Sequence, residues 1–315
     1  MTAVFGPVPS RRLGRSLGIN NVPFKTCSYA CVYCQLGATS ACTVERRPHV
    51  PVTDLVAEVT SRLDTLRSGG RLPDYLTFVA DGEPTLDAHL GDAIRALRPL
   101  GVPVAVITNA SLLSREDVRV DLRDADWVSV KVDAVDERTW HVINRPHGSL
   151  RLDSVLAGGR TFAERFRGTL TTETMLLRGQ NDGDDHVVRL ADYLASLDPA
   201  VAYVAIPTRP TAEPWARAPD ETTVNRVVQQ LAARLRRVEY LIGYEGNAFD
   251  TTGDAVADLL AITAVHPMRE EAVQGLFHGS GEDASRALER LVAAGQLVAT
   301  GYDGRTYYVR RFPQG

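Results

Sequence analysis

The sequence predicts an α/β fold built of repeated strand–helix units, followed by a smaller C-terminal part of different character. Its 315 residues correspond to about two domains. Hydrophobic residues make up 44% and charged residues 23%, which is ordinary globular usage and excludes disorder, collagen-like repeats and coiled coil. Through most of the chain, short apolar runs alternate with amphipathic segments, as is typical of parallel β/α units.

Six apolar runs have the length of strands, and each is followed by an amphipathic segment. We expect strands at 16–22, 75–80, 103–108, 127–132, 169–177 and 201–206. We expect helices at 53–68, 86–99, 114–122, 151–166, 184–197 and 220–236. The chain therefore predicts six β/α units.

The segment from about residue 253 onward has another pattern. We expect helices at 254–264, 268–277 and 282–294, then two strands, Gln296–Thr300 and Thr306–Phe312. The connection Gly301-Tyr302-Asp303-Gly304 contains Asp-Gly, a hairpin signal. Three helices and a hairpin resemble a winged helix, which is related to the helix-turn-helix readers of DNA.

The charge of this C-terminal segment argues against DNA. Six arginines face eight acidic residues, a net of −2, whereas a DNA-binding domain is normally basic. A packing or peptide-docking module is the favoured interpretation, and contact with RNA through Arg310 and Arg311 stays open.

Charge is distributed unevenly along the chain. The formal net charge is −4, which indicates no global attraction to nucleic acid. The first fifty residues, however, contain six basic residues and only Glu45 as an acidic one, a net of +5. A site built by this segment is expected to be locally cationic. No run reaches 18 apolar residues and no signal-peptide core is found, so we expect a cytoplasmic protein.

The four cysteines all lie between residues 27 and 42. Cys27, Cys31 and Cys34 have the spacing C-x3-C-x2-C, and three thiolates on one loop suit a metal or an iron–sulfur cluster better than disulfides. Structural zinc usually takes four ligands. Three ligands would leave one iron of a [4Fe-4S] cluster open. Cys42 is interpreted as a small buried hydrophobic residue, with a role as fourth ligand as the alternative.

The cysteine loop, with Tyr33 before the third cysteine, resembles the signature of the radical SAM superfamily. That resemblance implies a [4Fe-4S] cluster on Cys27, Cys31 and Cys34 whose open iron binds S-adenosylmethionine (SAM). It also implies a low-potential electron donor such as flavodoxin or ferredoxin. Reduction then yields a 5'-deoxyadenosyl radical that abstracts hydrogen from a substrate, chemistry that belongs to the cofactor.

A second motif supports this resemblance. Asp81-Gly82-Glu83-Pro84-Thr85 follows an apolar run and resembles the GGEP-like loop that binds the methionyl amino group of SAM, with Asp81 in place of the first glycine. Gly82, Glu83 and Pro84 are the expected SAM-binding residues. The alternative is an ordinary strand-to-helix turn with Pro84 at the first helical position.

Further stretches resemble the wyosine-synthase-like group of this superfamily. They are Phe5 to Gly14, Gly18 to Cys27, Ile143 to His147, Glu173 to Asp182 and Val265-His266-Pro267. Members that form the wyosine base on tRNA have a second cluster bound by upstream cysteines, and this chain has none before Cys27. The resemblance implies a partial (β/α)6 TIM-type barrel over residues 1–250, followed by a winged-helix-like domain at 251–315. Active sites of such barrels lie at the carboxyl ends of the strands.

The expected strand at 127–132 has a polar face formed by Ser129, Lys131 and Asp133. Because strands covered on both faces are normally apolar, this face indicates either a lumen that holds a polar ligand or an exposed edge strand. The family resemblance places Ser129 and Asp133 near the ribose and methionyl carboxylate of SAM, and Thr108 and Asn109 in a similar place.

No catalytic residue can be assigned, but two substrate-site candidates follow from the pattern. Glu173 shares a face with Thr171 and Met175, and a carboxylate inside a barrel requires a partner or ligand. Arg209, after the last strand, has the guanidinium geometry to clamp an anion. Asn181 is interpreted as a helix cap. Arg145 and His147 lie in an expected loop that could meet substrate.

The favoured function is radical SAM catalysis in tRNA or nucleoside modification. The alternative is a peptide-modifying radical SAM enzyme whose winged helix binds a leader peptide. A remote alternative is a metal-sensing, DNA-binding regulator.

Overall fold

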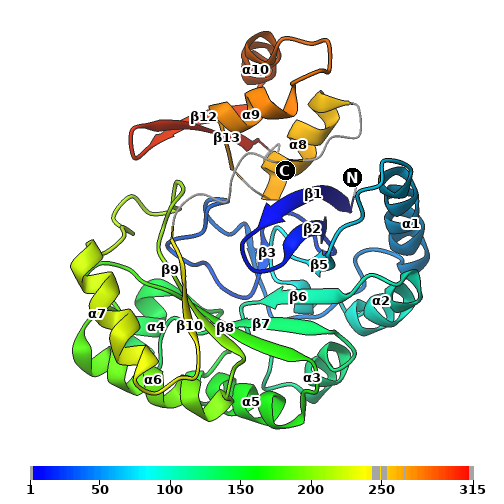
Figure 1. Ribbon diagram of the computed structural model, residues 1–315. Helices are drawn as coiled ribbons and strands as arrows, with labels where there is room; N and C mark the ends of the chain where they lie inside the picture. The colour runs from blue at the N-terminus through cyan, green and yellow to red at the C-terminus, as the bar shows by residue number, and fades with distance from the viewer. Residues whose placement is uncertain (1–2, 243–248, 250–253, 266, 312–315) are drawn as a thin grey trace.

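The computed structural model describes residues 3–242, 249, 254–265 and 267–311. A large sheet curls into an open, partial barrel with helices on its outer side, and the C-terminal segment forms a separate small unit above β1 and β2 (Figure 1). The predicted α/β fold with a partial barrel is therefore confirmed.

The barrel sheet has eight strands in the order β1-β2-β5-β6-β7-β8-β9-β10. All neighbouring pairs are parallel except β1 with β2. The bounds are β1 Val4–Ser10, β2 Gly14–Ile19, β5 Tyr75–Phe78, β6 Val104–Thr108, β7 Trp127–Lys131, β8 Thr169–Met175, β9 Val201–Ala205 and β10 Val238–Leu241. The six expected strands are confirmed, and β1 and β10 are additional strands at the two edges.

Helices follow the strands along the chain. They are α1 Val52–Ser68, η1 Pro84–Leu86, α2 Leu90–Leu97, η2 Arg98–Leu100, α3 Glu116–Leu122, α4 Glu137–Ile143, α5 Leu152–Arg165, α6 Asp184–Leu197 and α7 Glu221–Ala232. The amphipathic pattern explains their packing. In α1, for example, Leu55, Val59, Leu63 and Leu66 lie on one face and are buried against the sheet. The six expected helices are present, and α4 is an additional one.

The C-terminal segment has a core of its own, which includes Leu259, Met268 and Leu291. Its elements are α8 Ala255–Val265, β11 Met268–Arg269, α9 Glu270–Leu276, α10 Ala284–Ala293, β12 Leu297–Tyr302 and β13 Arg305–Arg310, with a sheet in the order β11-β13-β12. The expected three helices and hairpin are thus present. The winged-helix assignment remains a prediction, and the expected boundary at 250/251, His266 and Phe312 lie outside the described residues.

The C-terminal segment contacts β1, α1 and the loop after β9, and Asp258 of α8 forms an ion pair with Arg62 of α1 (3.6 Å). Val8 of β1 packs against its core. The hydroxyls of Tyr302 and Tyr307 donate hydrogen bonds to the carbonyls of Pro207 (3.1 Å) and Thr208 (3.0 Å), just after β9. Within the described part of the chain, no helix has the length and apolar character needed to cross a membrane.

Candidate functional site

The cysteine loop connects β2 with α1, and backbone hydrogen bonds join it to the end of α4. Its first part forms β3 (Thr26–Cys27), which pairs with β4 (Ala41–Cys42). The backbone N–H groups of Ala30 and Val32 donate to the carbonyls of Asn144 (3.0 Å) and Ile143 (2.9 Å), at the end of α4. The loop is therefore held in one shape by its own β3–β4 pairing and by the distant segment at the end of α4.

Each of the three clustered cysteine sulfurs accepts a hydrogen bond from a side-chain N–H group. The donors are Lys25 Nζ to Cys34 (3.1 Å), Asn109 Nδ2 to Cys27 (3.5 Å) and Asn144 Nδ2 to Cys31 (3.5 Å). They come from three separate parts of the chain. All three cysteines are half-buried and free.

Burial determines the protonation of Cys27 and Cys31. It raises the pKa of the Cys31 thiol to about 12, with Asp133 adding to the rise, and it raises the pKa of the Cys27 thiol still further. These two thiols are therefore protonated at neutral pH unless a metal displaces their protons, as a coordinated metal does. Among the described residues, no three His, Cys, Asp or Glu side chains converge on one metal-ion position. Three half-buried thiols with N–H donors at their sulfurs have the chemistry of iron–sulfur ligands.

The expectation that Cys42 is buried was wrong. Cys42 lies on β4, directly opposite Cys27, and is exposed. Both residues of β4, Ala41 and Cys42, are exposed, whereas Thr26 and Cys27 of β3 are half-buried, so pairing with β3 does not bury the Cys42 side chain. The role of Cys42 as a fourth ligand stays a prediction.

The Gly82 loop, Asp81 to Pro84, packs backbone to backbone on the cysteine loop. Lys25 N–H donates to the Asp81 carbonyl (3.0 Å), and Glu83 N–H donates to the Thr26 carbonyl (3.0 Å). A Cβ at Gly82 would lie 1.8 Å from the Thr26 carbonyl oxygen, so only glycine fits. Pro84 begins η1, which makes the loop a strand-to-helix turn as well.

The carboxylate of Glu83 is buried and engaged on both oxygens. Oε1 accepts hydrogen bonds from the Thr108 hydroxyl (2.6 Å) and from Thr85, and Oε2 accepts from Asn109 N–H (2.7 Å). Burial raises the pKa of Glu83, while these donors lower it. The side chains of Glu83 and Thr108 thus tie the loop after β5 to the loop after β6.

The polar face of β7 lies in the middle of the sheet, between β6 and β8. The alternative of an exposed edge strand was therefore wrong. Ser129 is fully buried, and its hydroxyl has no hydrogen-bond partner among the described residues. Asp133 accepts hydrogen bonds from Tyr33 OH, Asn144 Nδ2 (2.8 Å) and Met175 N–H (2.8 Å). Asp133 organises the site, whereas the unsatisfied Ser129 hydroxyl is suited to a ligand.

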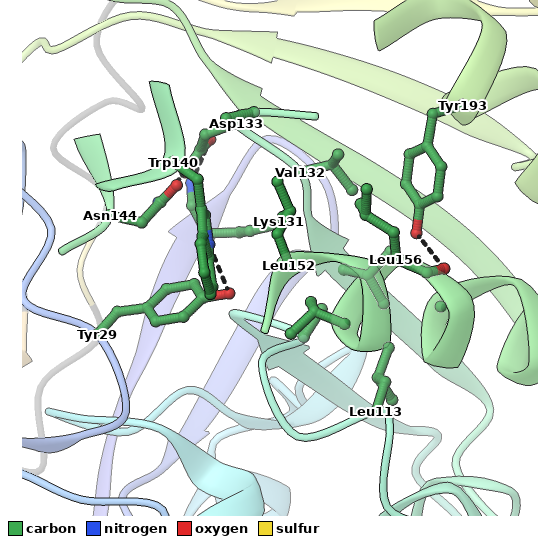
Figure 2. A pocket seen from close by; sticks show the side chains of 15 residues that line it. Tyr29, Leu113, Lys131, Val132, Asp133, Trp140, Asn144, Leu152, Leu156 and Tyr193 are labelled. Carbon is green, nitrogen blue, oxygen red and sulfur yellow. Dashed lines mark hydrogen bonds and ion pairs between the residues drawn. The ribbon is translucent and has the colours of Figure 1, made fainter. Parts of the chain in front are cut away.

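Figure 2 shows a small cavity on the other side of β7, next to α4 and α5. Trp140 Nε1 donates to the Tyr29 hydroxyl (3.0 Å), and Tyr193 OH donates to the Leu156 carbonyl (3.1 Å). The cavity has a volume of about 20 Å³, room for about one water. It is a packing void, and the hydrogen bond from Trp140 in its wall anchors Tyr29 of the cysteine loop.

A larger cavity of about 300 Å³ lies at the carboxyl ends of β7, β8 and β9. We call it the lumen cavity. Its charged and sulfur-bearing lining residues are Arg11, Arg12, Cys34, Lys131, Glu173, Met175 and Arg209. Its volume is at the lower end of the range for small-molecule sites. The cysteine loop and a group of charged side chains thus share one cavity.

Glu173 lies in the lumen cavity between two cations. It accepts from Lys131 Nζ (2.8 Å) and from Arg12. Burial by itself would raise the pKa of Glu173, but Lys131 and Arg12 lower it to about 2. Conversely, Asp133 and Glu173 raise the pKa of Lys131 above its usual value despite burial. The site therefore holds a permanent carboxylate and a permanent ammonium.

Of the other predicted site residues, one lines the lumen cavity and three do not. Arg209 lines the lumen cavity and donates to Gln35 Oε1 (2.9 Å). Arg145 pairs with Glu213 (2.5 Å), and His147 contacts Ser149; neither is among the lumen-cavity lining. Asn181 is not a helix cap, because Gly183 precedes α6.

Asn181 instead closes the loop that follows β8. It is fully buried, accepts from Leu177 N–H (2.8 Å) and donates to the carbonyls of Asp133 (2.9 Å) and Met175 (2.8 Å). Its amide has both a donor and an acceptor, so it satisfies three backbone groups at once.

Sequence reasoning missed four site residues: Lys25, Arg12, Asn144 and the hydroxyl role of Tyr33. Lys25 could have been found from the amino-acid composition. Of the 35 Lys and Arg residues only Lys25 and Lys131 are lysine, and both belong to this site. Arg12, Tyr33 and Asn144 could not have been found in this way, because their importance depends on contacts across the barrel.

Residues 21–191 match the model of the radical SAM superfamily. The chain belongs to the radical SAM superfamily and is an enzyme, and membership implies SAM and an iron–sulfur cluster. UPF0026 protein MJ1312 of Methanocaldococcus jannaschii is 42% identical to it over 313 residues, which covers 98% of this chain and 96% of that protein.

Two solved structures share the fold. A radical SAM methyltransferase from Sphaerobacter thermophilus aligns with a TM-score of 0.53 at 20% identity, over 72% of this chain and 67% of that one. A structure of TYW1 with a lysine–pyruvate adduct bound aligns with a TM-score of 0.53 at 16% identity, over 71% of this chain and 76% of that one. At these identities the likeness concerns the fold alone.

Proposed function

We propose that this enzyme binds a [4Fe-4S] cluster through Cys27, Cys31 and Cys34 and binds SAM beside it. A cluster held there would supply one electron to cleave SAM into methionine and a 5'-deoxyadenosyl radical, which would abstract hydrogen from a substrate in the lumen cavity. The observation that carries the proposal is the position of Cys34. It lines the same cavity as Lys131 and Glu173, so the cysteine loop and a polar substrate site adjoin.

The residues around the cysteines have distinct roles in this proposal. Lys25, Asn109 and Asn144 orient the sulfurs. The backbone of the Gly82 loop binds SAM, together with Ser129, whose buried hydroxyl suits a ligand. Asp133 holds Tyr33 and Asn144 in place, and Glu83 joins the two loops that border the site.

As the substrate we favour a tRNA or a nucleoside-containing molecule. The basic turn between β1 and β2 supports this choice, because its Arg11 and Arg12 line the cavity. We further propose a low-potential donor such as flavodoxin or ferredoxin, a cytoplasmic location, and a domain boundary near residue 250. The contacts of Tyr302 and Tyr307 with the loop after β9 support a role for the C-terminal domain in substrate recruitment.

Anaerobic reconstitution tests the catalytic part. We expect protein reconstituted with iron and sulfide to bind about four irons and to release 5'-deoxyadenosine from SAM when reduced with dithionite. Cys31→Ala should lose both properties, whereas Cys42→Ser should retain them. Tetrahedral zinc in oxygen-protected protein, or no 5'-deoxyadenosine from cluster-loaded protein, would contradict the proposal.

Filter binding tests the substrate class. Unfractionated tRNA should bind the reconstituted enzyme at 50 mM salt and much more weakly at 300 mM salt, because phosphate contacts release counterions. Indifference to tRNA together with tight binding of a peptide would favour the peptide-modifying alternative instead.

A further inference from the structure

Five residues other than glycine have a positive φ in the part of the chain that the structure describes. Asp198 (φ 46°) ends α6 and Asp303 (φ 48°) lies in the turn between β12 and β13, and aspartate tolerates this left-handed backbone. The other three are Lys25 (φ 60°), Ala110 (φ 64°) and Arg145 (φ 44°). For residue types such as these a left-handed backbone is uncommon, so each requires an explanation.

Each of these three residues is, or directly follows, a residue whose side chain donates to a cysteine sulfur. Lys25 itself donates to Cys34, Asn109 before Ala110 donates to Cys27, and Asn144 before Arg145 donates to Cys31. Strained backbone of this kind persists where the surrounding structure holds it, typically at functional sites. We propose that Lys25, Ala110 and Arg145 are positioning residues, whose left-handed turns direct the three N–H donors at the sulfurs. The inference rests on the proposed function, because it concerns the same cluster site.

The turn at Arg145 is held by the cysteine loop. The carbonyls of Asn144 and Arg145 both accept a hydrogen bond from the backbone N–H of Ala30 (3.0 and 3.1 Å). Residue 145 also precedes Pro146, a position that normally has extended backbone with a negative φ. The left-handed turn therefore brings two successive carbonyls to one N–H group, and the Asn144 side chain beside them donates to the sulfur of Cys31.

The turn at Ala110 fixes the amide of Asn109. The backbone N–H of Ser111 donates to Asn109 Oδ1 (2.9 Å). With its oxygen engaged in this way, the Asn109 amide presents its NH2 group to Cys27 and to the Ser28 hydroxyl (2.9 Å). Reversal of the amide would break the bond to Ser111, so the backbone turn determines which end of the amide faces the sulfur.

Lys25 occupies a turn position that normally belongs to glycine. Thr26 N–H donates to the Pro23 carbonyl (3.1 Å), so Lys25 is the third residue of a β-turn. A β-turn with a positive φ at its third residue usually has glycine there. Glycine would relieve the turn but would supply no ammonium to Cys34, so the contact with that sulfur explains the side chain.

Two substitutions of Arg145 separate the turn from the side chain. Arg145→Asn and Arg145→Val both remove the ion pair with Glu213, but asparagine accepts a left-handed backbone and a β-branched residue does not. In the apoprotein, amide hydrogen exchange at 28–33 should be as slow in Arg145→Asn as in the parent, and roughly tenfold faster in Arg145→Val because the turn opens.

The reduction potential of the reconstituted protein then tests the donors, because hydrogen bonds to the sulfurs help to set it. In a redox titration followed by electron paramagnetic resonance, Arg145→Asn should keep the parent's potential. Arg145→Val should make reduction about tenfold less favourable, which is about 59 mV for a one-electron couple. Asn144→Ala should show the same shift, and its combination with Arg145→Val should show no larger one, since Arg145 acts through Asn144.

Equal exchange in the two Arg145 variants, or the parent's potential in Arg145→Val, would overturn the proposal. Where Arg145→Val does not fold, Lys25→Gly decides. Exchange at residue 26 should stay slow in Lys25→Gly, because glycine accepts the turn, while its potential becomes more negative, because no donor reaches Cys34. Fast exchange or an unchanged potential there contradicts the proposal. Failure of the parent to bind a cluster refutes the proposed function, whereas the exchange difference in the apoprotein does not depend on a cluster.

Discussion

Lys25 and Lys131 are the only lysines in a chain that uses arginine for its 33 other Lys/Arg positions. Lys25 is buried and has a positive φ of 60°, and its Nζ reaches both Cys34 Sγ and the Gly37 carbonyl. An ammonium is a compact point charge that fits between two acceptors, whereas a planar guanidinium is larger. The physical demand for a small cation thus explains lysine at this position.

Lys25 is expected to influence the reduction potential of the cluster. Hydrogen bonds and positive charge at cluster sulfurs favour the reduced state. Lys25→Met removes both, so the potential should become more negative in a redox titration followed by electron paramagnetic resonance. Arg47→Gln, at an exposed ion pair with Glu45, is the control and should leave the potential unchanged. An unaltered potential in Lys25→Met would show that the contact with Cys34 has no such role.

Asp81 should make stability depend on pH. Burial raises its pKa to about 7, against opposing effects of Asn20, Lys25 and Arg310. The folded protein therefore binds this proton more tightly than the unfolded chain does, and the free energy of unfolding falls as pH rises from about 4 to about 7. Asp81→Asn should stabilise the protein by roughly 2–4 kcal/mol at pH 8.5 and much less at pH 4.5. Denaturant unfolding at both pH values measures this, and an equal effect at both would refute the titration.

At the scale of elements, the apolar pattern of the sequence predicted those strands of the sheet that helices cover. Strands β5 to β9 have helices outside and neighbours on both sides, so their apolar runs stand out. The edge strands were missed. In β1, Pro7 and Pro9 interrupt the pattern, and proline is tolerated at edges because it lacks the N–H that a ladder needs. In β10, only Leu241 is buried, so the alternation is weak. The helix α4 has only seven residues.

The contact of the Gly82 loop with the cysteine loop predicts the effect of one methyl group. Gly82→Ala would place Cβ 1.8 Å from the Thr26 carbonyl oxygen, so the two loops must separate. We expect a loss of about 1–3 kcal/mol of unfolding free energy and weaker SAM binding, measured by denaturation and by calorimetry. At Gly148 a Cβ meets nothing within 4 Å, so Gly148→Ala should behave as the parent. Equal behaviour of the two variants would refute the close approach.

At the scale of the whole molecule, the C-terminal segment has a separate core yet contacts the rim of the lumen cavity. Its hairpin reaches the loop after β9 through Tyr302 and Tyr307, whose rings also pack edge to face with centroids 6.3 Å apart. The sequence predicted the elements of this segment but not where they would pack. Tyrosine hydroxyls in a hairpin have no sequence pattern that identifies their partners.

Removing both hydroxyls should loosen the segment. Tyr302→Phe with Tyr307→Phe deletes three hydrogen bonds, the two donated to the loop after β9 and the one that Tyr307 accepts from Arg269 Nε, each worth about 1 kcal/mol. Amide hydrogen exchange at 206–209 and in β12 should become faster, while exchange in β7 stays the same. Tyr308→Phe changes a hydroxyl that bonds to none of the described residues, and it is the matched control. Unchanged exchange in the double variant would show that other contacts hold the segment.

The sequence by itself determined the superfamily, the α/β architecture and the residues proposed to hold the cluster, because these depend on local spacing and periodicity. Glu173 was also found from sequence, since a carboxylate inside a barrel requires a partner. Only the tertiary structure decided that Lys131 and Arg12 are those partners, that Glu83 joins two loops, and that Cys42 is exposed. These contacts join residues far apart in the chain, and their energies depend on burial and charge that arise only when the barrel closes.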